Sequence, residues 1–264
     1  MKRSSLFFMQ LAFTLLVCVF MLVPVVLSLL AGLTRNYFQG LSSGLTFDWL
    51  AQVWQAYAPT VWLSLQLALA CAVCVCIIGV PAAYALVRMN NRFSRAFEEL
   101  MVLPVAMPGL ASALALLLTY GQFGAFRGSW IFILVGHVLF TLPFLVRPVM
   151  AVMQRQQLPV LEEAAASLGA GPIRRFFTVV VPNSRAGILA GVLMVVTLSL
   201  GEFNLTWMLH TPMTKTLPVG LADSYASARL EVASAYTLLF LLLIVPLLIA
   251  LQAISARLSR GDSQ

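Results

Sequence analysis

Charge is scarce in this sequence. Only 9% of its 264 residues are charged, against about 25% in a typical soluble domain. Hydrophobic residues make up 61% of the chain. The core of a soluble 264-residue protein could not hide so many apolar side chains from water. The composition therefore excludes an ordinary soluble protein. We expect one integral membrane domain over residues 1–264, without a second, soluble domain.

Residues and motifs of catalysis are also rare. The sequence has two histidines, His137 and His210. It contains no G-x-x-x-x-G-K-[ST], so no P-loop could hold ATP, and neither G-x-S-x-G nor H-E-x-x-H occurs. An intramembrane protease would need a Ser/His pair, an Asp pair or a metal site within the apolar runs, and none is evident. We predict no catalytic residue, no cofactor and no enzymatic activity.

Four cysteines are present, and Cys71, Cys74 and Cys76 share one apolar run. Zinc sites need further polar ligands and supporting hydrogen bonds, which this run lacks. We therefore expect small apolar fillers of a helix and no metal site.

Long apolar runs dominate what is present. About 20 apolar residues span a bilayer as a helix, which predicts an all-α polytopic membrane protein with six spans. The first run exceeds the 7–15 residues or so of a cleaved signal peptide, so we expect it to be retained. Pro104 and Pro108-Gly109 should break the third span. The spans lie near residues 6–32, 61–87, 100–120, 129–152, 186–208 and 235–256.

The net charge of +7 comes from Lys and Arg between these spans, where such residues set membrane orientation. This explains the charge without a nucleic-acid partner. We predict a bacterial inner-membrane protein with both termini in the cytoplasm. On that assignment the inner segments carry Lys2, Arg3, Arg88, Arg92, Arg95, Arg155, Arg174, Arg175, Arg185, Arg257 and Arg260, and the outer ones Arg35, Arg127, Lys215 and Arg229.

The largest inner segment, residues 153–185, predicts a short helix over 160–169. Glu162 and Glu163 are expected in its first turn, where acids complement the helix dipole. Gly169 should end the helix, and a second short segment should close at Pro182.

One face of this helix is predicted to be apolar, because Leu161, Ala165 and Leu168 recur at helical spacing. A helix lying on lipid headgroups is the alternative, but such helices are rich in Lys and Arg. The 160–169 helix has two acids and no base, which favours a protein partner.

The same segment resembles the EAA loop of the permeases of binding-protein-dependent ABC importers. Glu163-Ala164-Ala165 is followed by three residues, Gly169, nine residues and Val179-Val180-Val181-Pro182. Valine replaces the isoleucine or leucine common in the family's last positions. The resemblance implies a cytoplasmic coupling helix that docks in a groove of a separate ATPase, with Glu163 and Gly169 seated in the groove. The residues expected to couple to the ATPase are Glu162, Glu163, Ala164, Ala165, Gly169 and Pro182.

Further partners follow from this resemblance: an ATPase dimer, a second permease subunit and a periplasmic or extracellular solute-binding protein. The binding protein would dock on segments 33–60 and 209–234. "LPVAMPG" (103–109) also resembles these permeases, and "LGEF" (200–203) with "KTLPVGL" (215–221) resembles phosphonate, oxyanion and polyamine permeases. The resemblance implies alternating-access import of a small polar solute such as a polyamine or 2-aminoethylphosphonate.

Polar residues inside the spans are candidates for the solute path. At about 100° per residue, Ser199, Glu202 and Thr206 share a helix face about 60° wide, and Gly201 beside them should permit close helix approach. His137 is the other candidate. Each of Glu202 and His137 has a structural alternative, a hydrogen bond between helices.

Two other classes remain open. An ion-coupled secondary transporter would need intramembrane acids, and Glu202 is the one available. A structural membrane subunit without transport activity would not need the acidic inner helix.

Overall fold

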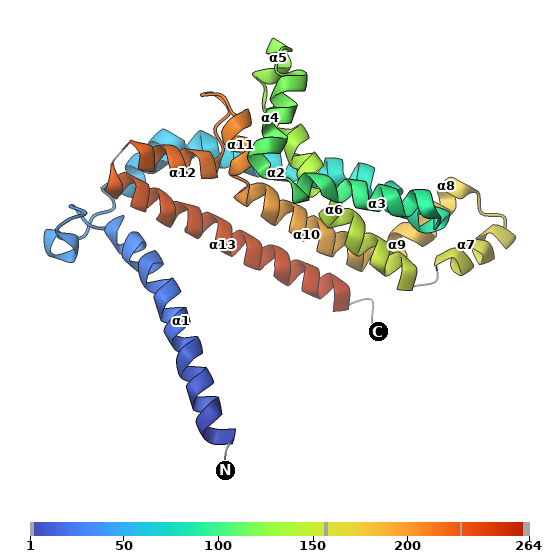
Figure 1. Ribbon diagram of the computed structural model, residues 1–264, viewed down its shortest axis with the longest axis horizontal. Coiled ribbons are helices and arrows are strands. Elements are labelled where there is room, and N and C mark those ends of the chain that lie inside the picture. Colours follow the sequence, from blue (N-terminus) through green and yellow to red (C-terminus); the bar gives the residue numbers. More distant parts are fainter. Residues whose placement is uncertain (1–2, 156–157, 228, 261–264) are drawn as a thin grey trace. The chain divides into compact units, whose positions relative to one another are not determined.

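The computed structural model describes residues 3–155, 158–227 and 229–260, which form helices joined by loops (Figure 1). Within these ranges the extended pairing is limited to one bridge, between Thr34 and Leu45. The all-α class is confirmed. The elements are α1 (Arg3–Ala31), η1 (Gly40–Ser43), α2 (Asp48–Met89), α3 (Arg92–Ala106), α4 (Gly109–Tyr120), α5 (Gly124–Arg127), α6 (Trp130–Arg155), α7 (Leu158–Ser167), α8 (Pro172–Arg175), η2 (Phe176–Val180), α9 (Val181–Asn183), α10 (Arg185–Gly201), α11 (Asn204–Leu209), α12 (Leu217–Ala226) and α13 (Leu230–Arg260).

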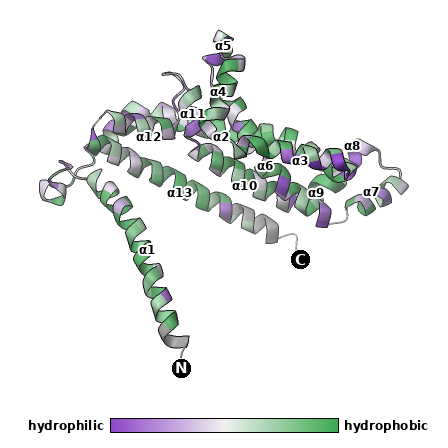
Figure 2. Ribbon diagram, in the orientation of Figure 1, coloured by the Kyte–Doolittle hydropathy of each residue, from purple (hydrophilic) through white to green (hydrophobic). Residues whose placement is uncertain are grey.

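Four of the described helices are long and apolar enough to cross a membrane: Leu6–Ala31, α2, α6 and Leu230–Ala253. Two bent helix pairs, α3 with α4 and the stretch Pro172–Asn183 with α10, would raise the number to six. Figure 2 shows the apolar residues along α1, α6 and α10, and hydrophilic ones on α7 and α8. The protein is thus polytopic, and the first, second, fourth and sixth predicted runs correspond to its long helices.

α2 begins at Asp48, well before the predicted start of the second span. The predicted outer segment 33–60 therefore contains the first turns of a helix. Pro59 and Pro81 both lie inside α2 without ending it.

The predicted third span is broken, and α3 and α4 meet at an angle of 101°. Met107 has an extended backbone (φ −85°, ψ 146°) because it precedes Pro108, and a residue before proline disfavours the α conformation. Pro104, also expected to break this span, lies inside α3. The break therefore depends on Pro108.

The predicted fifth span, 186–208, is wrong as a continuous helix. α10 ends at Gly201, Glu202 is extended (φ −71°, ψ 119°), and α11 starts at Asn204. Before α10 the chain is already helical through Pro182, which was predicted to close the preceding segment, and the bend falls at Ser184.

α6 and α10 pack closely in the unit that contains Pro59–Val219 and the residues from Val245 onward. A Cβ on Gly187 would lie 2.7 Å from the Pro148 carbonyl oxygen, and one on Gly191 would lie 2.8 Å from Leu145 Cα. Small residues thus let the two backbones meet. The glycine predicted for this purpose, Gly201, has no atom within 4 Å of its Cβ position, so that prediction is wrong.

The other unit combines the residues up to Ala58 with Gly220–Ile244. Its buried Tyr236 packs edge-on against Tyr57, with ring centroids 4.9 Å apart. A Cβ on Gly32, the residue after α1, would lie 2.5 Å from the Ala235 nitrogen of α13. The absence of a side chain at Gly32 therefore allows the end of α1 to lie close to α13.

Candidate functional site

The loop between α6 and α10 is built around a glycine turn. The Ala170 N–H donates to the Ala165 carbonyl at 3.0 Å, and the Gly169 N–H donates to the Ala166 carbonyl at 2.9 Å. This is the Schellman pattern, which needs a left-handed residue, and Gly169 has φ +82°. Pro172 is then the first residue of α8. The turn thus sets the angle between two short helices.

The two acids of α7 have different surroundings. Glu163 is exposed, whereas Glu162 is only 3% exposed. The Tyr84 hydroxyl donates to Glu162 Oε1 at 2.5 Å, and Arg88 Nη1 donates to the Tyr84 oxygen at 2.9 Å. The prediction that both acids are offered to a partner is therefore corrected for Glu162.

Neither acid lies in the first turn of α7, because the helix begins at Leu158. The predicted stabilisation by the helix dipole is therefore wrong. The buried positions of α7 are Leu158 and Glu162.

The loop exposes several large apolar side chains beside the charged Glu163 and Arg174. Leu168 is 89% exposed, and Ala165 is partly buried. The exposed apolar residues of the loop, called the loop patch below, are Val160, Leu161, Leu168, Ile173 and Phe177.

The predicted path residues meet in one hydrogen-bonded network. His137 Nδ1 lies 2.8 Å from Ser199 Oγ, and Nε2 lies 2.8 Å from Thr206 Oγ1. The Thr206 hydroxyl donates its one proton to Glu202 Oε2 at 2.8 Å, so it accepts a proton from Nε2. His137 is thus held with its proton on Nε2, and Ser199 donates to Nδ1.

The Glu202 carboxylate also caps α11. Its Oε1 accepts from the Leu205 N–H and its Oε2 from the Thr206 N–H, each at 2.9 Å. These N–H groups would otherwise lack partners at the start of a helix. The predicted path residues Ser199, Glu202 and Thr206 therefore do not share one continuous helix: Ser199 lies in α10, Glu202 follows its end, and Thr206 lies in α11.

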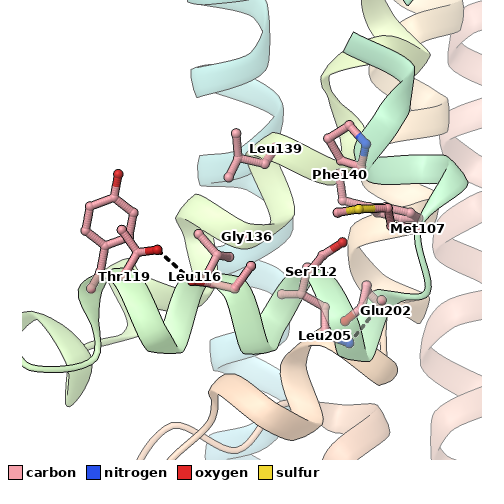
Figure 3. Close-up of a pocket in the computed structure, with 13 residues that line it drawn as sticks. Met107, Ser112, Leu116, Thr119, Gly136, Leu139, Phe140, Glu202 and Leu205 are labelled. Carbon is pink, nitrogen blue, oxygen red and sulfur yellow. Dashed lines mark hydrogen bonds between the residues drawn. The ribbon is translucent and has the colours of Figure 1, made fainter. Parts of the chain in front are cut away.

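A cavity of about 320 Å³ lies beside this network (Figure 3). Glu202 lines it, whereas Ser199, Thr206 and His137 do not. The Ser112 hydroxyl oxygen is buried without a hydrogen-bond partner. The lining consists of Pro104, Met107, Gly109, Ser112, Ala115, Leu116, Thr119, Tyr120, Gly136, Leu139, Phe140, Glu202 and Leu205.

Sequence reasoning missed Tyr84 and Ser112, because nothing in the local pattern separates a tyrosine or serine in an apolar run from a filler. It counted Arg88 as an inner charge and did not identify its bond to Tyr84. It also missed Gly187 and Gly191, although their spacing of four residues is a signal for helix packing. Within the described ranges, no three His, Cys, Asp or Glu residues come together as a metal site would require.

Residues 75–260 match the protein family described as binding-protein-dependent transport system inner membrane component. The chain is 30% identical to the sulfate transport system permease protein CysW of Synechocystis sp., covering 69% of this chain and 70% of that protein. It is 33% identical to the putrescine transport system permease protein PotI of Escherichia coli, covering 62% of this chain and 60% of that protein.

The fold is similar to a chain in the crystal structure of a bacterial ABC transporter involved in the import of the acidic polysaccharide alginate. The TM-score is 0.73 at 15% identity, over 97% of this chain and 96% of that one. At this identity the likeness concerns the fold alone.

Proposed function

Since this chain belongs to the family of binding-protein-dependent transport system inner membrane components, we propose that it imports a small polar solute by alternating access driven by a separate ATPase. Members of this family are multi-pass transport components of the inner membrane and not enzymes. The sequence has no P-loop, which fits a permease whose ATP is hydrolysed by another subunit.

One observation carries the proposal: the loop between α6 and α10 combines a rigid turn with an exposed apolar surface. Gly169 fixes the turn, the loop patch supplies apolar area, and Glu163 supplies an exposed carboxylate for a basic residue of the ATPase. Ala164 is also exposed, and its small side chain lets a partner's surface approach closely. Alternating access then follows when closure of the ATPase dimer moves this loop.

The solute class we propose is cationic or zwitterionic, for example a polyamine or 2-aminoethylphosphonate. Support comes from Glu202, an acid that lines the cavity beside α4, α6 and α11. Ser112 adds a hydroxyl whose hydrogen bond is unmade. His137, Ser199 and Thr206 would act behind this surface, by holding Glu202 in place.

The remaining partners complete the assembly. A second permease subunit, identical or related, would supply the other half of the path, and a solute-binding protein would dock on segments 33–60 and 209–234. We propose that both termini and the loop patch face the cytoplasm, because most Lys and Arg residues fall on that side of the assigned spans.

Co-purification with the ATPase tests the proposal. The ATPase should bind the wild-type permease and be lost, by at least about tenfold, on Glu163→Lys or Gly169→Asp, since one unpaired charge at an interface costs several kcal/mol. The same charge reversal at the exposed Glu99 of α3, Glu99→Lys, is the matched control and should retain the ATPase.

Two outcomes would overturn it. A wild-type permease that binds no ATPase would favour a structural membrane subunit. Solute transport by the reconstituted protein alone, driven by a proton or sodium gradient, would favour the ion-coupled secondary transporter.

A further inference from the structure

Glu162 is a buried carboxylate of α7 that accepts a hydrogen bond from a residue of α2. Its hydrogen-bond donor, Tyr84, precedes it by 78 residues in the chain. The Tyr84 ring also packs edge-on against Phe176 of η2, with centroids 5.4 Å apart. One tyrosine thus contacts both halves of the loop that carries the glycine turn.

The donor and acceptor roles in the hydrogen-bond network of Arg88, Tyr84 and Glu162 are fixed by chemistry. Arg88 has no acceptor atom, so its guanidinium donates to the Tyr84 oxygen, and the tyrosine proton is left for Glu162. The Arg88 guanidinium also lies over the Tyr84 ring, 5.7 Å from its centroid. A buried carboxylate without a partner is costly, so Glu162 favours every arrangement in which α7 stays against Tyr84.

The neighbouring acid cannot serve this purpose. Glu163 is exposed and follows Glu162 by one residue, which on a helix turns its side chain by about 100°. The adjacent acids therefore point to different partners, one toward the protein's own second span and one toward solvent.

We propose that Glu162 and Tyr84 form a mechanical link that passes movement of α7 to α2, while Glu163 meets the ATPase. Glu162 and Tyr84 are positioning residues, because neither touches solute or nucleotide. A bond between a hydroxyl and a carboxylate is short and strong for its size, which suits a link that must hold while the loop moves. This inference rests on the proposed function, since it needs an ATPase to move the loop.

The experiment measures movement of α2 in the assembled complex. Spin labels are placed at exposed positions of α2 and α6, Ile77 and Ile131, in a background with the four cysteines replaced by alanine. The distance between the labels is recorded without nucleotide and after trapping with ATP and vanadate. No solute has to be identified for this measurement.

Tyr84→Phe is the main variant, because it removes one oxygen atom and keeps the ring against Phe176. The ATPase should stay bound. The fraction of molecules whose label distance changes on trapping should fall about tenfold, as expected for losing a hydrogen bond to a charged group. Glu162→Ala should do the same, and the double variant should be no worse than either. Glu162→Gln, which keeps an acceptor, should restore part of the movement. Glu99→Ala is the control and should behave as wild type.

Wild-type movement in Tyr84→Phe would overturn the link, and so would fully additive effects in the double variant. Loss of the ATPase from Tyr84→Phe would also overturn it, because the link is placed after docking. Failure of the proposed function is distinguishable: in that case the wild-type permease itself binds no ATPase or shows no nucleotide-dependent change.

Discussion

The Glu202 carboxylate accepts two hydrogen bonds from Thr206, one from its backbone N–H at 2.9 Å and one from its hydroxyl at 2.8 Å. One side chain therefore stabilises the break between α10 and α11 and orients the threonine that meets His137. The break is what brings an acid to the edge of the cavity, so the local backbone and the candidate solute site depend on each other.

Replacing Glu202 should separate these two effects. Glu202→Ala removes the cap of α11 and should destabilise the protein by about 1–3 kcal/mol, since three buried donors lose their acceptor. Glu202→Gln keeps an acceptor and should lose less. Thermal unfolding of the detergent-purified protein measures both. For Glu202→Gln we also expect altered transport with the ATPase still bound, and unchanged uptake kinetics would limit Glu202 to its capping role.

Gly191 should tolerate no larger residue. Gly191→Ala places a Cβ 2.8 Å from Leu145 Cα, so α6 and α10 must move apart at a cost of about 1–3 kcal/mol. The midpoint of thermal unfolding in detergent should fall accordingly. Gly201→Ala is the matched control on the same helix, because nothing lies within 4 Å of its Cβ position. Equal midpoints for the two variants would contradict the close packing of α6 on α10.

Gly169 is required for its backbone conformation and not for space. Its Cβ position is free, but its φ of +82° costs an alanine about 1–2 kcal/mol. Gly169→Ala should therefore loosen the loop and speed tryptic cleavage after Arg174 or Arg175 by about tenfold. Gly171→Ala, with φ −67° and an equally free Cβ position, should be cleaved at the wild-type rate. Equal cleavage of both variants would show that the turn does not depend on Gly169.

Much of the fold could be predicted because a span needs only length and apolarity. The runs that contain α1, α6 and α13 were found within a few residues. The prediction of a continuous fifth helix is wrong at Glu202. Hydropathy is averaged over a window, so it does not detect a single residue whose carboxylate accepts hydrogen bonds from the first N–H groups of the next helix.

The candidate sites were predicted unevenly for a related reason. The helix of the loop and its end at Gly169 are local features, and glycine and proline mark them in the sequence. Which acid faces outward is not local, because it depends on Tyr84 in another helix. Glu162 and Glu163 are the same type of residue at adjacent positions, so the local sequence does not distinguish them.

The sequence by itself determined the membrane class, the position of the apolar runs and the place of the glycine turn. Each follows from chemistry within about 20 consecutive residues. Only the tertiary structure decided that Glu162 is buried against Tyr84 and that His137 joins Ser199 and Thr206, which lie 62 and 69 residues away in the chain. Such partners are chosen by helix packing, where buried polar groups must find one another in the absence of water.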